Sequence, residues 1–265
     1  MKNISTAECA VIKKDFREVW DSKMARSTML IVPLLMVVII PIVFLVIICN
    51  VPASHVNGVD QIMKMLPPEA QHFDIRQGTF YVMTNTMFPM FFLMIPLMTS
   101  SVSAASSFVG ERERGTLETL VLTPMTLQKI FHAKVLGCIL LSSIVTAISF
   151  VSFAVVISVG DILLGMPFFL NWSWLVCIFL FAPGVTVFGV VFMVLVSAKS
   201  KSYIEAIQTS GYIVLPLILI FAGEFTGLFS LDAFRLFLIS AVVIVLDIIL
   251  WFVTARSFRA EKLLH

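Results

Sequence analysis

Long runs without charged side chains dominate this sequence and limit the folds that it can adopt. The run from Thr28 to Cys49 contains no charged residue, and five further apolar stretches follow it. A helix that crosses the hydrocarbon core of a bilayer needs about 20 such residues. Charged residues make up only 13% of the chain, whereas soluble domains carry roughly 25%. A soluble core this apolar would lack a polar covering, so we expect a membrane protein.

Six transmembrane helices are predicted, which gives an all-α polytopic fold. Their expected positions are Thr28 to Cys49, one helix between Arg76 and Glu111, about Val135 to Val159, about Trp172 to Ser197, about Ala206 to Ala222, and about Leu236 to Ala255. The second stretch is longer than one span requires, so its helix is expected to be tilted or to extend beyond the bilayer.

The basic residues predict the orientation of a multi-pass protein in the plasma membrane. With six spans, all but three of the 18 Lys and Arg residues fall on the side of the two termini, the exceptions being Lys64, Arg76 and Arg235. Basic loops stay in the cytoplasm, so both termini are expected there. Trp172 and Trp174 then fit an aromatic belt at the outer interface.

The N-terminal segment, residues 1–27, has two chemically different faces when it is drawn as a helix. One face carries Cys9, Ile12, Phe16, Val19 and Trp20, and the other carries Lys14, Arg17, Glu18 and Asp21. This pattern is typical of a helix that lies in the membrane interface, and the alternative is a helix packed on a soluble partner. Residues 28–265 then form the transmembrane domain, with an outer loop at about 50–78.

A segment of mixed charge and apolar character lies between the second and third spans, at about 109–125. It reads GERERGTLETLVLTP from Gly110 to Pro124. Leu117, Leu120 and Val121 form an apolar patch with helical spacing, and Pro124 ends the helix. We expect a short amphipathic helix that either docks on a cytoplasmic protein or lies on lipid.

The stretch ERERGTLETL, followed by Thr-Pro, resembles the cytoplasmic signature of type-2 ABC exporter permeases. The six spans and the N-terminal interfacial helix are similar to that family across almost the whole chain. The resemblance implies a coupling helix that enters a groove of a separate ATPase subunit, with Leu117 and Leu120 as apolar anchors. Its other implied contacts are Glu111, Arg112, Glu113, Arg114, Gly115, Thr116 and Glu118.

The resemblance also implies an assembly of two copies of this chain with two ATPase subunits. ATP and Mg would be bound by the ATPases, and this chain would hold no cofactor. The sequence agrees, because it lacks the G-x-x-x-x-G-K-[ST] phosphate-binding loop and contains no Gly-Lys dipeptide. No catalytic residue, metal site or nucleic-acid partner is expected, and the four cysteines show no C-x-x-C spacing.

Methionines in the second span indicate where a substrate could pass. Their spacing places them on one narrow face of a helix, and they are Met83, Met87, Met90, Met94 and Met98. Methionine is flexible and accepts varied apolar partners, so this stripe either lines a path for a hydrophobic or amphipathic peptide or drug, or serves ordinary packing. The small residues from Thr99 to Ser107 predict close helix packing.

Two acidic residues lie in or beside predicted spans. Asp247 falls within the sixth span and should face the protein interior or water. Glu224 lies between Gly223 and Gly227, where the resemblance implies a re-entrant turn at the outer surface. Both acids either take part in transport or are structural.

Other functions stay open from the sequence alone. An ATP-independent ion-coupled transporter or channel would use Asp247. A membrane-embedded enzyme lacks support because no H-E-x-x-H motif occurs. Sodium, lipid and polysaccharide are the alternative substrates of an ABC exporter.

Overall fold

The computed structural model describes residues 6–50, 66–67, 70–116, 126–197, 199–200, 202–226 and 232–257. Within these residues the fold contains helices and no strand, as predicted. The helices are α1 (Thr6–Asp21), α2 (Lys23–Arg26), α3 (Val32–Leu34), α4 (Ile40–Asn50), α6 (Ile75–Val82), α7 (Phe88–Ala104), α8 (Glu111–Glu113), α10 (Leu127–Leu164), α11 (Trp172–Val176), α12 (Ala182–Ser197), α13 (Tyr203–Ser210), α14 (Val214–Phe225) and α15 (Ala233–Ser257).

Short segments of other helical geometry connect several of these helices without ending them. Five are π-helical, namely Ser27–Ile31, Leu35–Ile39, Met83–Met87, Ala105–Gly110 and Cys177–Phe181, and Gly211–Ile213 is a 3-10 turn. Six continuous helices result that are long and apolar enough to cross a membrane: Ser27–Asn50, Ile75–Glu113, Gln128–Leu164, Trp172–Ser197, Tyr203–Glu224 and Ala233–Thr254. The six predicted spans are therefore confirmed.

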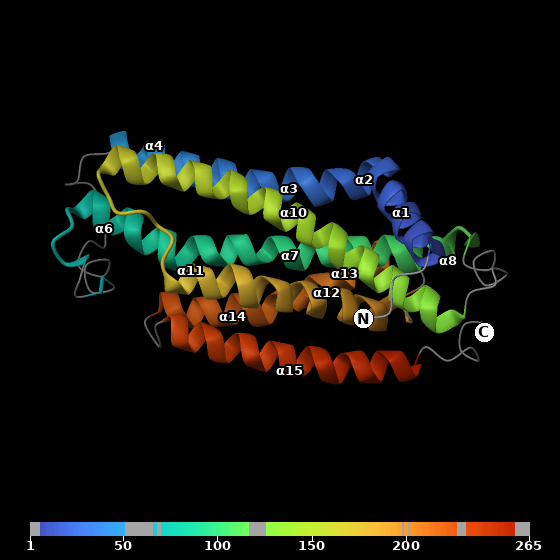
Figure 1. The fold of residues 1–265 in the computed structure, drawn as a ribbon. Coiled ribbons are helices and arrows are strands. Elements are labelled where there is room, and N and C mark those ends of the chain that lie inside the picture. The colour runs from blue at the N-terminus through green and yellow to red at the C-terminus, as the bar shows by residue number, and fades with distance from the viewer. Residues whose placement is uncertain are drawn as a thin grey trace.

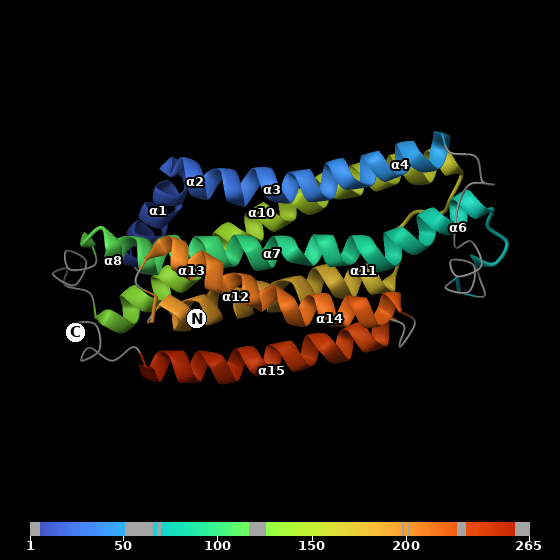
Figure 2. The ribbon, with the colours of Figure 1, turned by 180° about the vertical axis from the view of Figure 1, so that it is seen from behind.

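The six long helices run side by side along one axis, with the second span in the middle (Figure 1). α3 and α4 lie on one side of α7, and α12, α14 and α15 lie on the other (Figure 2). α10 crosses α7 diagonally, from beside α4 at one end of the bundle to the α12 side at the other (Figure 1). The second span is the most buried of the six, which matches its central position. α1 is inclined to this axis and lies at the same end of the bundle as α8 (Figure 1).

Local sequence explains how the central helix begins and packs. Asp74 and Gln77 form a reciprocal capping box at the start of α6, which satisfies backbone donors that have no helical partner. Farther along, a Cβ atom at Gly189 of α12 would lie 2.1 Å from Ser100 Oγ of α7. The two helices can approach this closely only because position 189 is glycine. The predicted close packing of the Thr99–Ser107 region is thus confirmed.

Many large apolar side chains lie on the outside of the bundle. Val151, Phe179 and Leu219 are 61%, 75% and 72% exposed, respectively. A bilayer solvates such side chains as a protein core would, so this surface is the one that lipid covers. Trp172 is also exposed, in keeping with the predicted aromatic belt. Trp174 is 1% exposed and packs among phenylalanines such as Phe153, so its assignment to the belt was wrong.

Candidate functional site

The segment that resembles a coupling helix begins where the second span ends. α8 completes the span, Arg114 caps it, and Gly115 follows with a φ of +68°. This left-handed conformation favours glycine and commonly terminates a helix. The predicted apolar anchors and Glu118 lie in residues 117–125, outside the described residues. What the structure describes is therefore the base of the loop, residues 110–116.

Glu111 is fully buried at this base and connects three helices. The Nζ atom of Lys14 in α1 lies 2.6 Å from Glu111 Oε1, and the Nζ atom of Lys134 in α10 lies 2.6 Å from Oε2. Lys134 is only 2% exposed, so this second pair is held away from water. Removing one partner of a buried pair strands the other charge and costs about 3–5 kcal/mol.

Asp15 of α1 extends the same cluster. Ser107 Oγ donates a 2.7 Å hydrogen bond to Asp15 Oδ2, and Lys134 Nζ lies 3.8 Å from that oxygen. Lys134 also donates to the Ser107 carbonyl oxygen at 2.8 Å. Burial raises the pKa of the Asp15 carboxyl above its ordinary value of 3.8, although the nearby Lys134 opposes the shift. α1 is therefore attached to the second and third spans through buried polar contacts.

The three charged residues after Glu111 each reach a different element. Arg112 Nη2 donates to the carbonyl oxygens of Ser197, at 2.8 Å, and Ser200, beyond the end of α12. Glu113 Oε2 accepts a hydrogen bond from the backbone N–H of Tyr203, the first residue of α13. Arg114 forms an ion pair with Glu18 of α1. Together with Glu111, these residues tie the loop base to α1, α10, α12 and α13.

The acidic and basic side chains of this cluster balance each other in charge. The carboxylates of Asp15, Glu18 and Glu111 approach within 4.8 Å of one another. Lys134 lies within 4.0 Å of two of these carboxylates, and Arg114 pairs with the third. This arrangement fits a network of ion pairs, because each of the three carboxylates already has an ammonium or guanidinium partner.

The predicted contact residues thus fall into two groups. Arg112, Glu113, Arg114 and Gly115 are exposed and Thr116 is half-buried, so a partner protein can reach this group. Glu111 is 0% exposed, a position that does not favour its predicted direct contact with an ATPase. We assign it to the internal network instead.

Sequence reasoning missed three members of this network, Lys14, Asp15 and Lys134. One signal was available in α1: Asp15 lies three residues after Ile12 and four before Val19, on the face predicted to be apolar. A carboxylate on an apolar helix face requires a partner. The partner itself could not be predicted, because Lys134 lies far away in the sequence.

The α1 helix also differs from a purely interfacial helix. Val19 is 3% exposed, and Ile12 lies against Gly137 of α10, so part of the predicted apolar face packs on this chain. Phe16 and Trp20 stack on each other and are 38% and 46% exposed. These two rings remain available to the membrane interface.

The methionine stripe occupies a partly open face of the central span. All five methionines are half-buried: Met83, Met87, Met90, Met94 and Met98. Neighbouring side chains on the other faces are buried, as shown by Phe92 and Leu93, both 0% exposed. The stripe is thus accessible in a single protomer.

Asp247 and Glu224 lie in different environments. Asp247 is 6% exposed, which confirms that it faces the protein interior, and its Oδ1 atom accepts no hydrogen bond within the described residues. Glu224 lines a small crevice with Asn85 and Trp174 at the end of the bundle opposite α8. α14 passes through Gly223 and ends at Phe225. The implied re-entrant turn falls partly on residues 227–231, outside the described part of the chain.

Comparison with known families identifies one match. The family model described as ABC-2 family transporter protein matches residues 9–256, which covers nearly all of the chain. No curated protein matches the sequence. The family match argues against the membrane-embedded enzyme and the ATP-independent transporter that the sequence alone left open.

Proposed function

Because the chain belongs to the ABC-2 family of transporter proteins, we propose that it is the permease subunit of an ATP-driven exporter. Members of this family are multi-pass membrane subunits that lack an ATPase domain and pair with separate ATPase subunits. In our proposal, two copies of the chain enclose the transport path. Two ATPase subunits bind Mg-ATP and drive cargo out of the cell.

The proposed orientation places the α8 end of the bundle in the cytoplasm. Most described basic residues lie at that end, including Lys14, Arg112, Lys129 and Lys134, whereas Arg76 and Arg235 lie at the opposite end. Lys and Arg near the ends of spans favour the cytoplasmic side. Both termini are then cytoplasmic, because the number of spans is even.

The ion network at the loop base is the observation that carries this proposal. In it, the ATPase docks on residues 112–120, and Leu117 and Leu120 enter its groove. Glu111 does not dock but ties the docked loop to α1 and α10. A displacement of the docked helix then reaches four helices of the bundle through hydrogen bonds and ion pairs rather than through a flexible tether.

Copurification of the ATPase tests the docking step. The tagged chain, purified in mild detergent from its native host, is expected to bring a stoichiometric ATPase with it. Leu117→Asp or Leu120→Asp should abolish this association, because each introduces a charge into an apolar contact. Leu170→Asp, which adds the same charge at an exposed position two residues before α11, is the matched control. Loss of the ATPase in the control, or its retention in both loop variants, would contradict docking at this loop.

The proposed cargo is hydrophobic or amphipathic, such as a peptide or a drug. Its support is the methionine stripe, which combines a half-buried position with flexible, polarisable side chains. In a dimer that brings two central spans together, the two stripes would face each other across the path. Sodium or polysaccharide cargo would require polar groups that the five methionines do not supply, whereas a lipid remains the alternative among hydrophobic or amphipathic cargoes.

A second role is proposed for Asp247 because its buried carboxylate keeps one oxygen without a hydrogen bond. An ionisable group of this kind within a span often marks an ion or proton pathway. In our proposal Asp247 couples a cation to export. If Asp247→Asn exports at the wild-type rate with the same dependence on pH and sodium, this coupling role is excluded.

A further inference from the structure

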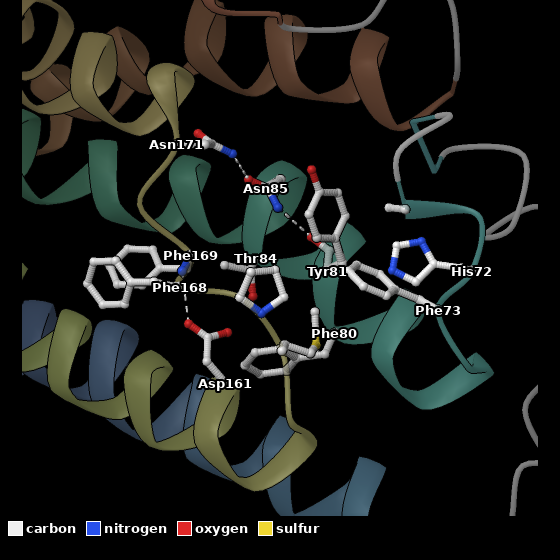
Figure 3. A pocket seen from close by; sticks show the side chains of 13 residues that line it. His72, Phe73, Phe80, Tyr81, Thr84, Asn85, Asp161, Phe168, Phe169 and Asn171 are labelled. Carbon is white, nitrogen blue, oxygen red and sulfur yellow. Dashed lines mark hydrogen bonds between the residues drawn. The ribbon is translucent and has the colours of Figure 1, made fainter.

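A cavity of about 340 Å³ (Figure 3) lies beside α6, at the end of the bundle opposite α8 (Figure 1). It is bounded by α6, the π-helical segment Met83–Met87, the end of α10 and the loop 165–171. Its walls are largely aromatic, with contributions from Phe73, Phe80, Tyr81, Phe168 and Phe169. A volume of this size falls within the range of small-molecule sites, about 300–1,000 Å³.

The loop that closes the cavity is held in place by specific contacts. Gly165 has a φ of +64° and ends α10, and Gln77 Nε2 donates a 2.8 Å hydrogen bond to the Leu164 carbonyl oxygen. Asp161 Oδ2 accepts a 2.9 Å hydrogen bond from the backbone N–H of Phe169 (Figure 3). The cavity is therefore formed before any ligand arrives, which lowers the entropic cost of binding.

Glycine at position 160 shapes the aromatic wall. A Cβ atom there would lie 2.5 Å from Phe80 Cζ and 2.9 Å from a methyl group of Leu45. The absence of a side chain lets the Phe80 ring lie directly against α10, one residue before Asp161. An aromatic ring and a carboxylate are thus brought to neighbouring positions of one wall.

Most polar side chains of the cavity already have partners. Asn171 Nδ2 donates to Asn85 Oδ1 at 2.6 Å, and Asn85 Nδ2 donates to the Tyr81 carbonyl oxygen. The Thr84 hydroxyl differs: it is buried, with Thr84 only 2% exposed, and it has no hydrogen-bond partner within the described residues. Asp161 is 5% exposed, and its one side-chain hydrogen bond to another described residue occupies Oδ2 alone.

No cation neutralises the Asp161 carboxylate from within the described chain. None of the ion pairs found among the described residues includes Asp161, and no described residue lining the cavity is Lys or Arg. His72 lines the cavity but is exposed, stacked against Phe73. Asp161 and Thr84 therefore bring a carboxylate and a buried, unpartnered hydroxyl to the lining of an aromatic enclosure.

We propose that this cavity binds a small hydrophobic ammonium ion, that is, a protonated amine on an apolar or aromatic body. The ammonium N–H groups donate to Asp161 and Thr84, and the rings of Phe80 and Phe169 enclose the apolar body. Aromatic faces attract cations as well as apolar groups, so both halves of such a ligand find complementary surface. The ligand could be exported cargo that pauses near its exit, and that assignment rests on the proposed exporter function. Binding of the ammonium ion itself does not depend on it.

Binding of radiolabelled 2-phenylethylammonium to the full chain in lipid nanodiscs tests the site. Empty nanodiscs of the same lipid provide the background. We expect saturable binding, and unlabelled 2-phenylethanol, which has the same body without the charge, should compete at least about tenfold more weakly. Sodium chloride should compete no better than lithium chloride. Absence of saturable binding, equal competition by the alcohol, or selective displacement by sodium would each overturn the proposal.

Two sets of variants locate the binding within the cavity. Asp161→Asn keeps an oxygen to accept the Phe169 N–H, and it should weaken 2-phenylethylammonium about tenfold or more without changing 2-phenylethanol. Thr84→Val should weaken the ammonium ion several-fold, whereas Thr84→Ser should bind like the wild type. If Asp161→Asn binds 2-phenylethylammonium as tightly as the wild type, the proposal is overturned. If that variant does not fold, equal affinities of Thr84→Val and Thr84→Ser for the same ion overturn the proposal.

This assay contains neither ATP nor an ATPase. A negative result removes the ammonium site and leaves the docking proposal untouched. Conversely, loss of the docking proposal through Leu117→Asp or Leu120→Asp leaves the cavity result standing.

Discussion

Lys134 Nζ lies 2.6 Å from Glu111 Oε2. This ion pair joins the first turns of the third span to the last turn of the second. Both side chains are almost completely buried. The contact lies immediately before the loop that we propose to dock an ATPase, and Lys14 adds α1 to it from the other side of Glu111. The contribution of this pair to the free energy of unfolding and its role in transmitting movement can be measured separately.

Breaking this pair from one side should destabilise the protein strongly. Glu111→Gln is expected to lower the free energy of unfolding by about 3–5 kcal/mol, because the Lys134 charge loses its closest partner while buried. The double variant Glu111→Gln with Lys134→Met should recover part of this loss, because the Lys134 charge is no longer stranded, whereas the buried Asp15 loses the nearby ammonium group and keeps its hydrogen bond from Ser107. Denaturant titration in mixed micelles measures both effects. Glu113→Gln, at an exposed position, is the control and should change stability by less than about 0.5 kcal/mol.

Stability should depend on pH through Asp15, whose pKa is raised by burial. The folded protein then binds this proton more tightly than the unfolded chain does. The contribution of Asp15 to stability is fully present below pH 3.8, the ordinary pKa of an aspartate in the unfolded chain. It is lost as the pH rises from 3.8 through the raised pKa of the folded protein. Asp15→Asn should remove this part of the pH dependence. Thermal unfolding of both proteins across this interval provides the measurement, and parallel curves would contradict the assignment.

Close packing of the second and fourth spans should make Gly189 intolerant of a side chain. Gly189→Ala places a methyl group 2.1 Å from Ser100 Oγ and 3.2 Å from Ser100 Cβ, and we expect a loss of about 1–3 kcal/mol. Adding Ser100→Ala removes the shorter contact and should restore part of the stability. Gly211→Ala meets nothing within 4 Å and serves as the control. A Gly189→Ala protein as stable as this control would show that the helices are farther apart than described.

Replacement of methionines in the stripe should change which substrates are exported. Leucine has a similar volume and costs less than about 1.5 kcal/mol at each site, but it is branched and less adaptable. The triple variant Met87→Leu, Met90→Leu and Met94→Leu is therefore expected to fold and to narrow the range of transported compounds. Met193→Leu, at a buried position outside the stripe, is the control. An unchanged substrate range and rate in the triple variant would remove the stripe from the transport path.

The spans were predictable because each depends on a local property, an apolar run of sufficient length. The first span, predicted as Thr28 to Cys49, gained one residue at each end, and the fourth, Trp172 to Ser197, needed no change. The third span was underestimated: it was predicted to end near Val159, but the helix continues to Leu164. The additional residues include Asp161, which broke the apolar pattern although it is buried within the protein.

The candidate site was predictable only in part, because its contacts join residues that are distant in the sequence. The ERER motif located the loop base correctly, but Lys14 and Glu111 are 97 residues apart. No spacing rule connects them. Trp174 shows the same limit: a tryptophan near the end of a span is typical of an interface. Only the phenylalanines contributed by α7 and α10 show that this one is buried.

The central claim is that the buried network transmits movement from a docked ATPase and does not itself form the docking surface. It is tested most directly by measuring both ATPase copurification and substrate-stimulated ATP hydrolysis in the charge-neutral double variant Glu111→Gln with Lys134→Met. We predict that this variant retains a stoichiometric ATPase but loses most of the stimulation by substrate. Loss of the ATPase, as expected for Leu117→Asp, would make Glu111 part of the docking surface, and full stimulation would show that the network does not transmit; either result contradicts the account.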